Sequence, residues 1–169
     1  MVTIRPERPE DHDAARVVHE RAFGAESGEA GLVDALRAEG AHVPELCLVA
    51  VEGEEVVAHV FFTRALLASG HEVLALAPMA VLPERQRAGV GSRLIEAALR
   101  RAAETGFPLV VVLGHPAYYP RFGFEPAAGY GVRAPWEVPP EAWMVHPLPA
   151  YDPHAQGVVT YARAFDAVT

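Results

Sequence analysis

The sequence predicts a single α/β domain. Strand-like and helix-like patterns alternate along its 169 residues, without internal repeats or low-complexity tracts. The continuous apolar run at 109–113 is typical of a strand in the centre of a sheet, buried on both faces. A second apolar run ends at Val81 and leads through glycines into a helical pattern from about Gly89. With 51% hydrophobic residues, the chain is long enough for one core but short for two, so we predict one domain over residues 1–169.

The N-terminal part is expected to hold a short strand at 2–5 and two helices. Pro9 and the acidic residues that follow it favour a helix start, because proline suits the first turn and carboxylates complement the helix dipole. This helix is expected to run to about Phe23. A second helix over 29–38 ends at Gly40, as glycine commonly ends helices.

Three strands are expected next, over 46–51, 56–67 and 73–81. The first two read as a hairpin closed by the polar residues 52–55. Residues 84–104 contain the glycine-rich turn and a helix whose buried stripe has helical spacing. The stripe comprises Val90, Leu94, Ala97, Ala98 and Leu99.

After the central strand, the chain breaks at 114–116, forms a short helix and begins a new strand at Phe124. Frequent prolines punctuate the remainder, and proline is poorly tolerated inside a sheet. We therefore expect only two further strands, near 143–145 and 158–162.

The glycine-rich turn predicts an anion-binding site at the start of a helix. Unpaired N–H groups converge at a helix N-terminus, and the helix dipole adds partial positive charge. Glycine lets a bulky phosphate ester approach the backbone, while Arg85, Arg87 and Arg93 add charge. A ligand that carries a pyrophosphate is the first hypothesis. The turn and helix start comprise Gln86, Arg87, Ala88, Gly89, Val90, Gly91 and Ser92.

Two common phosphate motifs are excluded by residues that the turn lacks. A P-loop needs a lysine on the phosphates, and this chain contains no lysine. A dinucleotide fingerprint needs a third glycine, but Leu94 stands in its place. What remains is a Q-x-x-G-x-G turn, which by itself also occurs as a plain helix entry.

A second segment, residues 114–124, adds specificity. It contains the pattern Tyr-x-x-x-Gly-Phe at Tyr119, Gly123 and Phe124. Together the two segments resemble the GNAT superfamily of acyl-CoA-dependent N-acyltransferases. The resemblance is specific over 74–124 and extends in element order over 1–125. The Tyr-Tyr-x-Arg-Phe-Gly-Phe form further resembles a bacterial subgroup of predicted N-acetyltransferases.

The resemblance implies a mixed, mostly antiparallel twisted sheet of about six to seven strands, flanked by about four helices. Two central parallel strands would splay apart, so that a pantetheine arm could hydrogen-bond the exposed backbone like an added strand. By the family's pattern, residues 1–125 bind acyl-CoA and residues 126–169 wall the acceptor side. The cofactor-binding residues implied are Met79, Ala80, Val81 and the turn from Gln86 to Ser92.

Aminolysis of a thioester needs a neutral amine and a proton source for the departing thiolate. The resemblance assigns the general acid to Tyr119, whose alternative role is packing beside the ligand. His59 and His115 are two candidates for the base, and a water chain could replace either. His59 lies in an apolar strand, where a histidine can equally be a satisfied core residue.

Other chemistries find less support. The eight histidines lack the close spacing of a metal site, so no metal is expected. Ser92 lacks a nucleophile elbow, and the single Cys47 fits a core residue in a reducing, cytoplasmic compartment. A formal net charge of −8 argues against nucleic acid, and no apolar stretch is long enough for a membrane span.

The sequence thus predicts an N-acetyltransferase that uses acetyl-CoA as co-substrate and transfers directly to a small-molecule or peptide amine. A non-catalytic acyl-CoA-binding sensor is the alternative. Residues 24–28 and 130–143 are implied to wall the acceptor. Trp136 and Trp143 would suit an aromatic pocket for a cationic amine, a hydrophobic seal or a homodimer interface.

Overall fold

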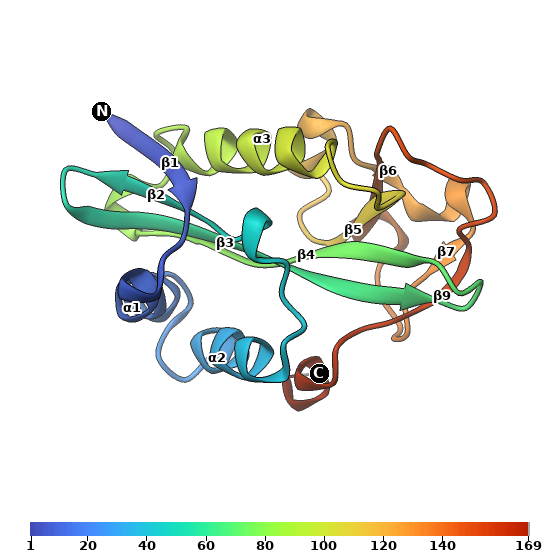
Figure 1. Cartoon of the computed structure of the whole chain (residues 1–169), viewed down its shortest axis with the longest axis horizontal. Helices are drawn as coiled ribbons and strands as arrows, with labels where there is room; N and C mark the ends of the chain where they lie inside the picture. Colours follow the sequence, from blue (N-terminus) through green and yellow to red (C-terminus); the bar gives the residue numbers. More distant parts are fainter. Residues whose placement is uncertain (169) are drawn as a thin grey trace. The chain divides into compact units, whose positions relative to one another are not determined.

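The computed structural model describes residues 1–168 and divides them into two compact units. The first unit comprises Met1–Thr63, Ala77–Arg101 and the C-terminal segment from Ala162. The second comprises Arg64–Leu76 and Ala102–Tyr161. Two long strands, β3 (Glu55–Leu67) and β4 (Glu72–Val81), run through both (Figure 1).

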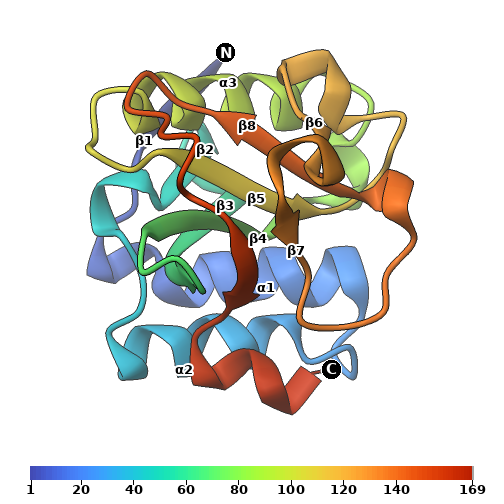
Figure 2. The same cartoon turned by 90° about the vertical axis from the view of Figure 1, so that its right-hand side faces the viewer.

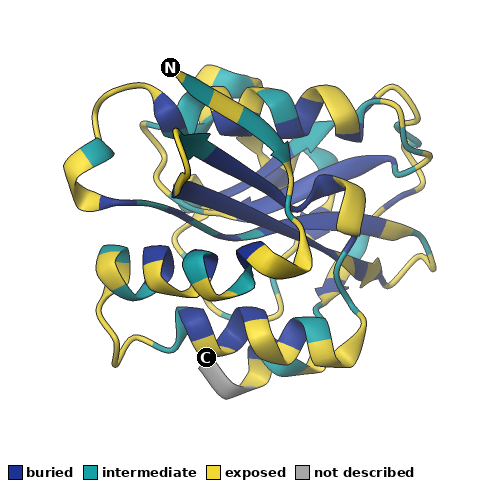
Figure 3. Ribbon diagram, turned by 60° about the vertical axis from the view of Figure 1, so that its left-hand side comes forward, coloured by how far each residue is buried: buried dark blue, intermediate teal, exposed yellow. Residues whose placement is uncertain are grey.

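The first unit is built on the antiparallel strands β1 (Val2–Pro6), β2 (Leu48–Glu52) and β3. Helices α1 (His12–Phe23) and α2 (Glu29–Glu39) lie on one face of these strands, and α3 (Val90–Ala102) lies on the other (Figure 3). Because helices cover both faces, β3 is buried at every position from Val56 to Thr63. Burial on both faces explains why β3 is apolar from Val56 to Phe62 except at His59.

The second unit contains the predicted parallel strand pair. Strand β4 pairs with β5 (Leu109–Leu113) in parallel, and β5 pairs with β8 (Trp143–Pro147) antiparallel (Figure 2). The parallel register joins Leu74 to Val110 and Ala75 to Val111. Three short strands complete the unit: β6 (Glu125–Pro126) on β8, and β7 (Val132–Arg133) beside β9 (Gly157–Thr160), which pairs with β3.

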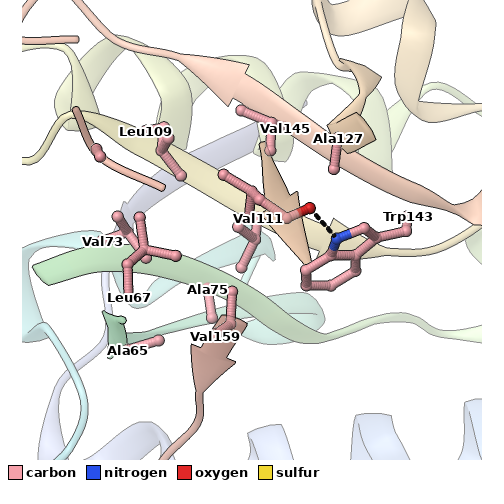
Figure 4. Close-up of a cluster of buried hydrophobic side chains, with 12 residues drawn as sticks. Ala65, Leu67, Val73, Ala75, Leu109, Val111, Ala127, Trp143, Val145 and Val159 are labelled. Carbon is pink, nitrogen blue, oxygen red and sulfur yellow. Dashed lines mark hydrogen bonds between the residues drawn. The ribbon is translucent and has the colours of Figure 1, made fainter. Parts of the chain in front are cut away.

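Trp143 belongs to the hydrophobic core of the second unit (Figure 4). This residue is 5% exposed, and its indole N–H donates to the Val132 carbonyl at 3.0 Å. The aromatic residue that the sequence offered for an acceptor pocket is therefore a buried core residue. Trp136 instead stacks on Tyr161, with ring centroids 5.0 Å apart.

The predicted elements are present with three differences. The short helix expected before Phe124 is a single 3-10 turn, η4 (Tyr119–Phe122). The strand expected from residue 46 begins at Leu48, because Pro44–Leu46 forms a 3-10 turn. The described residues hold nine strands and three α-helices, not six or seven strands and four helices, because β6 and β7 have only two residues each.

Neither a metal centre nor a membrane span is found in the part of the chain that the structure describes. No three of its His, Cys, Asp or Glu side chains gather as they would around a metal ion. None of its helices combines the length and the apolar character needed to cross a bilayer.

Candidate active site

The glycine-rich turn connects β4 to α3 in the first unit. After the 3-10 turn η3 (Pro83–Arg85), residues 86–89 form an exposed turn that leads directly into the helix. Arg87 and Gly89 both have left-handed backbone conformations, with φ of 66° and 83°. The Arg93 N–H donates to the Gly89 carbonyl at 3.1 Å. The turn is therefore exposed and its glycine-dependent backbone leads into the helix N-terminus, while anion binding there stays a prediction.

The arginines around this turn have different partners. Arg85 donates through two nitrogens to Glu52, at 2.9 and 2.5 Å, and Arg93 donates to the Val2 carbonyl at 3.1 Å. Arg87 is exposed and has no ion-pair partner among the described residues. Arg85 is thus tied to a carboxylate and Arg93 to a carbonyl of β1, whereas Arg87 makes no ion pair among the described residues. The sequence analysis did not identify Glu52 as the partner of Arg85.

The end of β4 alternates between buried and half-exposed positions. Pro78 and Ala80 are buried, whereas Met79 and Val81 are half-exposed. Pro78 has no N–H to donate, so the donors at this end of the strand come from its neighbours. The Gln86 side chain donates to the Val81 carbonyl at 3.0 Å and ties the strand end to the turn.

Tyr119 begins the turn η4 in the second unit. The His115 carbonyl accepts the N–H groups of Tyr118 and Tyr119, at 3.0 and 3.3 Å, while the His115 side chain is exposed. The Tyr119 ring meets Tyr118 and Phe124 edge-on, with centroids 5.2 and 5.5 Å apart. Burial, reinforced by Tyr118, raises the pKa of Tyr119 to about 12. The phenol therefore stays protonated in any ordinary assay and can serve as a donor.

Gly114 makes room for this ring. A Cβ atom on Gly114 would lie 2.3 Å from Tyr119 Cε2, a distance that forces one of the two to move. We expect Gly114→Ala to displace Tyr119 and to lower kcat about tenfold or more, with little change in KM for acetyl-CoA. In a Tyr119→Ala background the same substitution should cost nothing further, which a double-mutant cycle measures. Additive losses would contradict this account.

His59 belongs to a buried row of polar side chains in the first unit. Its Nε2 lies 2.8 Å from Glu7 Oε2, and its Nδ1 lies 2.9 Å from His19 Nε2. Glu7 also accepts from Arg37 at 2.5 Å. His59 is fully buried with both ring nitrogens engaged, so it has no nitrogen left for an acceptor amine. Its role as a base stays a prediction, and this geometry argues against it.

Sequence reasoning missed the other three members of this row, Glu7, His19 and Arg37. Only His19 left a signal, because it shares the buried stripe of α1 with Ala15 and Val18. A carboxylate only accepts, so His59 Nε2 donates to Glu7, and His59 Nδ1 shares a second hydrogen bond with His19 Nε2.

The row has clear electrostatic preferences. Burial lowers the pKa of His19 to about 3, and the nearby positive charge of His59 and Arg37 adds to the effect. Burial alone would raise the pKa of Glu7, but hydrogen bonds and charge from His59 and Arg37 hold it below its usual value. The folded state therefore favours neutral His19 and ionised Glu7.

This preference predicts a loss of stability in acid. Between pH 6.5 and about 3, His19 is protonated in the unfolded chain but not in the folded one, so stability falls as pH falls. From pH 8 to pH 5 the expected loss is about 2 kcal/mol. Urea unfolding at both values measures it. His19→Gln keeps a hydrogen-bonding side chain beside His59 but does not titrate, so it should reduce the difference in stability between pH 8 and pH 5. An unchanged difference would show that His19 is not its source.

The comparisons with known proteins agree with these features. Residues 3–127 match the family model described as an acetyltransferase (GNAT) domain. The chain is 42% identical to the uncharacterized N-acetyltransferase YjhQ of Escherichia coli K12, over 83% of this chain and 81% of that protein. The chain belongs to the GNAT acetyltransferase family. Enzymes of this family use acetyl-CoA as their co-substrate.

Two solved structures resemble this GNAT acetyltransferase along almost its whole length. The first is YhbS of Escherichia coli in complex with CoA, with 32% identity, a TM-score of 0.89 and coverage of 98% of this chain and 92% of that one. The second is a GNAT family acetyltransferase of Brucella melitensis in complex with acetyl-CoA, with 33% identity, a TM-score of 0.81 and coverage of 98% and 99%.

Proposed function

We propose that this GNAT acetyltransferase moves the acetyl group of acetyl-CoA directly to an amine acceptor in a ternary complex. The observation that carries the proposal is the exposed, glycine-formed start of α3, where Arg87 has no ion-pair partner among residues 1–168. The CoA and acetyl-CoA complexes of similar structures support this ligand. The diphosphate binds the turn from Gln86 to Ser92 through backbone N–H groups and Arg87.

The pantetheine arm binds along β4 in this proposal. Parallel pairing of β4 with β5 involves Leu74 and Ala75, and the arm takes up hydrogen bonds on the segment that follows. The Met79 N–H then meets the thioester carbonyl and stabilises the oxyanion as the amine attacks. Ala80 and Val81 contribute through backbone groups as well.

Tyr119 acts as the general acid on the departing sulfur. Attack of the amine nitrogen on the carbonyl carbon forms the C–N bond, the C–S bond breaks, and the phenol hydrogen goes to the thiolate. The proton of the amine goes to His115 or to water. His115 is preferred over His59 because its side chain is exposed, whereas both nitrogens of His59 are engaged.

The acceptor is a small-molecule or peptide amine. A formal net charge of −8 favours an approaching cation. The amine must lose its proton before attack, so turnover should rise with pH until the bound amine is neutral.

The test is a panel of amines with acetyl-CoA, read as free thiol, together with calorimetry of CoA binding. We expect CoA binding and thiol release with at least one amine. CoA binding without thiol release from any acceptor would instead support a non-catalytic acyl-CoA sensor. If calorimetry detected no binding of CoA, both the enzyme and the acyl-CoA sensor would be ruled out.

Gly89→Val tests the phosphate-binding turn and helix start at residues 86–92, which we call the cradle. Valine disfavours a φ of 83° and adds a side chain where the diphosphate approaches, so KM for acetyl-CoA should rise at least tenfold. Gly70→Val is the matched control, since Gly70 has a φ of 93° in a turn outside the cradle. Equal effects of the two variants on KM would mean that backbone strain, and not phosphate binding, explains the loss.

A further inference from the structure

His146 packs against the end of the turn η4, which begins at Tyr119. It is on β8, where it pairs with Val110 of β5, and both strands belong to the second unit. A Cβ atom on Gly123 would lie 3.1 Å from both Cε1 and Nδ1 of His146, so the ring rests against the backbone at the end of η4. Gly123 has a φ of 91° and ends this turn, its N–H donating to the Pro120 carbonyl.

A chain of ring contacts links His146 to the phenol. The His146 and Phe124 centroids are 5.3 Å apart, and Phe124 and Tyr119 are 5.5 Å apart. Phe124 is buried, so it has little freedom to absorb a shift on either side. Gly114 also contacts the Tyr119 ring closely, since a Cβ atom there would lie 2.3 Å from Tyr119 Cε2. The Tyr119 ring therefore packs against both Gly114 and Phe124, and Phe124 in turn packs against His146.

The His146 Nδ1 atom is buried and has no hydrogen-bond partner among the described residues. Buried nitrogens without a partner are uncommon, and packing alone does not require a histidine here. A phenylalanine would fill the same space without the unsatisfied atom. Histidine therefore adds something that phenylalanine lacks, a buried nitrogen beside the turn that can take up a proton.

We propose that His146 is a positioning residue for Tyr119. Its ring fixes the position of the phenol by packing against Gly123 and Phe124. This inference rests on the proposed function, in which Tyr119 donates to the departing sulfur. The neutral ring supports the turn, and a proton on Nδ1 introduces a donor against the backbone of Phe122 and Gly123. Protonation then draws the turn toward β8 and moves the phenol with it.

The titration has a defined direction. Burial lowers the pKa of His146, opposed by the Gly123 and Phe122 backbone and by the charge of Glu125 on β6. The neighbouring strand β5 (Leu109–Leu113) carries no titratable side chain. His146 is thus neutral near pH 7.5 and gains its proton only at a lower pH than an ordinary histidine does.

Kinetics at pH 7.5 give the first test. We expect His146→Ala to lower kcat about tenfold, with KM for acetyl-CoA changed less than about twofold, because only the placement of the acid is lost. His146→Phe should restore kcat by restoring the ring. His154→Ala, an exposed histidine of the same unit, is the matched control and should match wild type. A parallel rise in KM, or no loss of kcat in His146→Ala, would overturn the inference.

A second measurement needs no turnover. In protein labelled with 13C at the tyrosine Cζ, the Tyr119 signal is assigned by its absence in Tyr119→Phe. We expect this signal to move in wild type as the pH is lowered from 8 over the range in which the protein stays folded, and to stay fixed in His146→Phe. Circular dichroism defines that range. A Tyr119 signal that ignores both pH and His146→Ala overturns the inference whatever the activity. A responsive signal without thiol release from any amine overturns the proposed function alone.

Discussion

Tyr119→Phe is expected to lower kcat about a hundredfold or more while leaving the affinity for CoA unchanged. The substitution removes one hydroxyl and keeps the ring packed against Tyr118 and Phe124. General acid catalysis contributes roughly 10²- to 10⁴-fold, so its loss should dominate the kinetics. Steady-state thiol release gives kcat, and calorimetry with CoA gives the affinity.

Tyr118→Phe is the control for this experiment. Tyr118 is the neighbouring tyrosine, and Arg121 lies over its ring with the guanidinium carbon 4.5 Å from the centroid. We assign it a packing role, so its hydroxyl should be dispensable and kcat should stay within about twofold of wild type. Unchanged kcat in Tyr119→Phe would remove the acid role and leave Tyr119 as a packing residue.

Glu7→Gln is expected to destabilise the protein by about 3–5 kcal/mol, the usual cost of breaking a buried ion pair from one side. Glu7 is the acceptor for both His59 and Arg37, and all three side chains are largely buried. The glutamine side chain has only one acceptor oxygen. Its NH2 group would face the N–H groups of His59 or Arg37, which are donors as well. The Arg37 charge is then left without compensation in a site of low polarity.

Urea denaturation at pH 8 measures this loss. Glu84→Gln removes the partner of Arg21 in an exposed ion pair of the same unit, and such pairs contribute about 1 kcal/mol or less. Each variant removes one carboxylate charge, so a larger loss of stability in Glu7→Gln measures the effect of burial. Similar losses for both would show that the row around Glu7 behaves as a surface network.

Local sequence was enough to predict the parts of the site that lie within one turn or one element. The cradle depends on Gly89 and on the apolar stripe of α3, all within a few residues, and backbone preferences act at that range. The Tyr119 turn is set in the same way by Gly114, Gly123 and the short separation between them. The main strands follow from apolar periodicity, with boundaries shifted where Pro44 forms a turn.

Other features depend on contacts that no local pattern encodes. Trp143 looked like a pocket residue until its indole was found bonded to Val132, eleven residues away in a different strand. Strands β6 and β7, with two residues each, are too short to leave a periodic signal and exist because β8 and β9 offer them hydrogen bonds.

The sequence by itself determined the family and the glycine turn before α3, because the motifs that indicate them consist of residues close together in the chain. Only the tertiary structure decided the surroundings of the histidines. His59 meets Glu7 and His19 across 52 and 40 residues, and His146 meets Gly123 across a strand pair. Whether a buried imidazole is a base, a structural link or a support depends on which distant groups fold against it, since those groups set its hydrogen bonds and its charge.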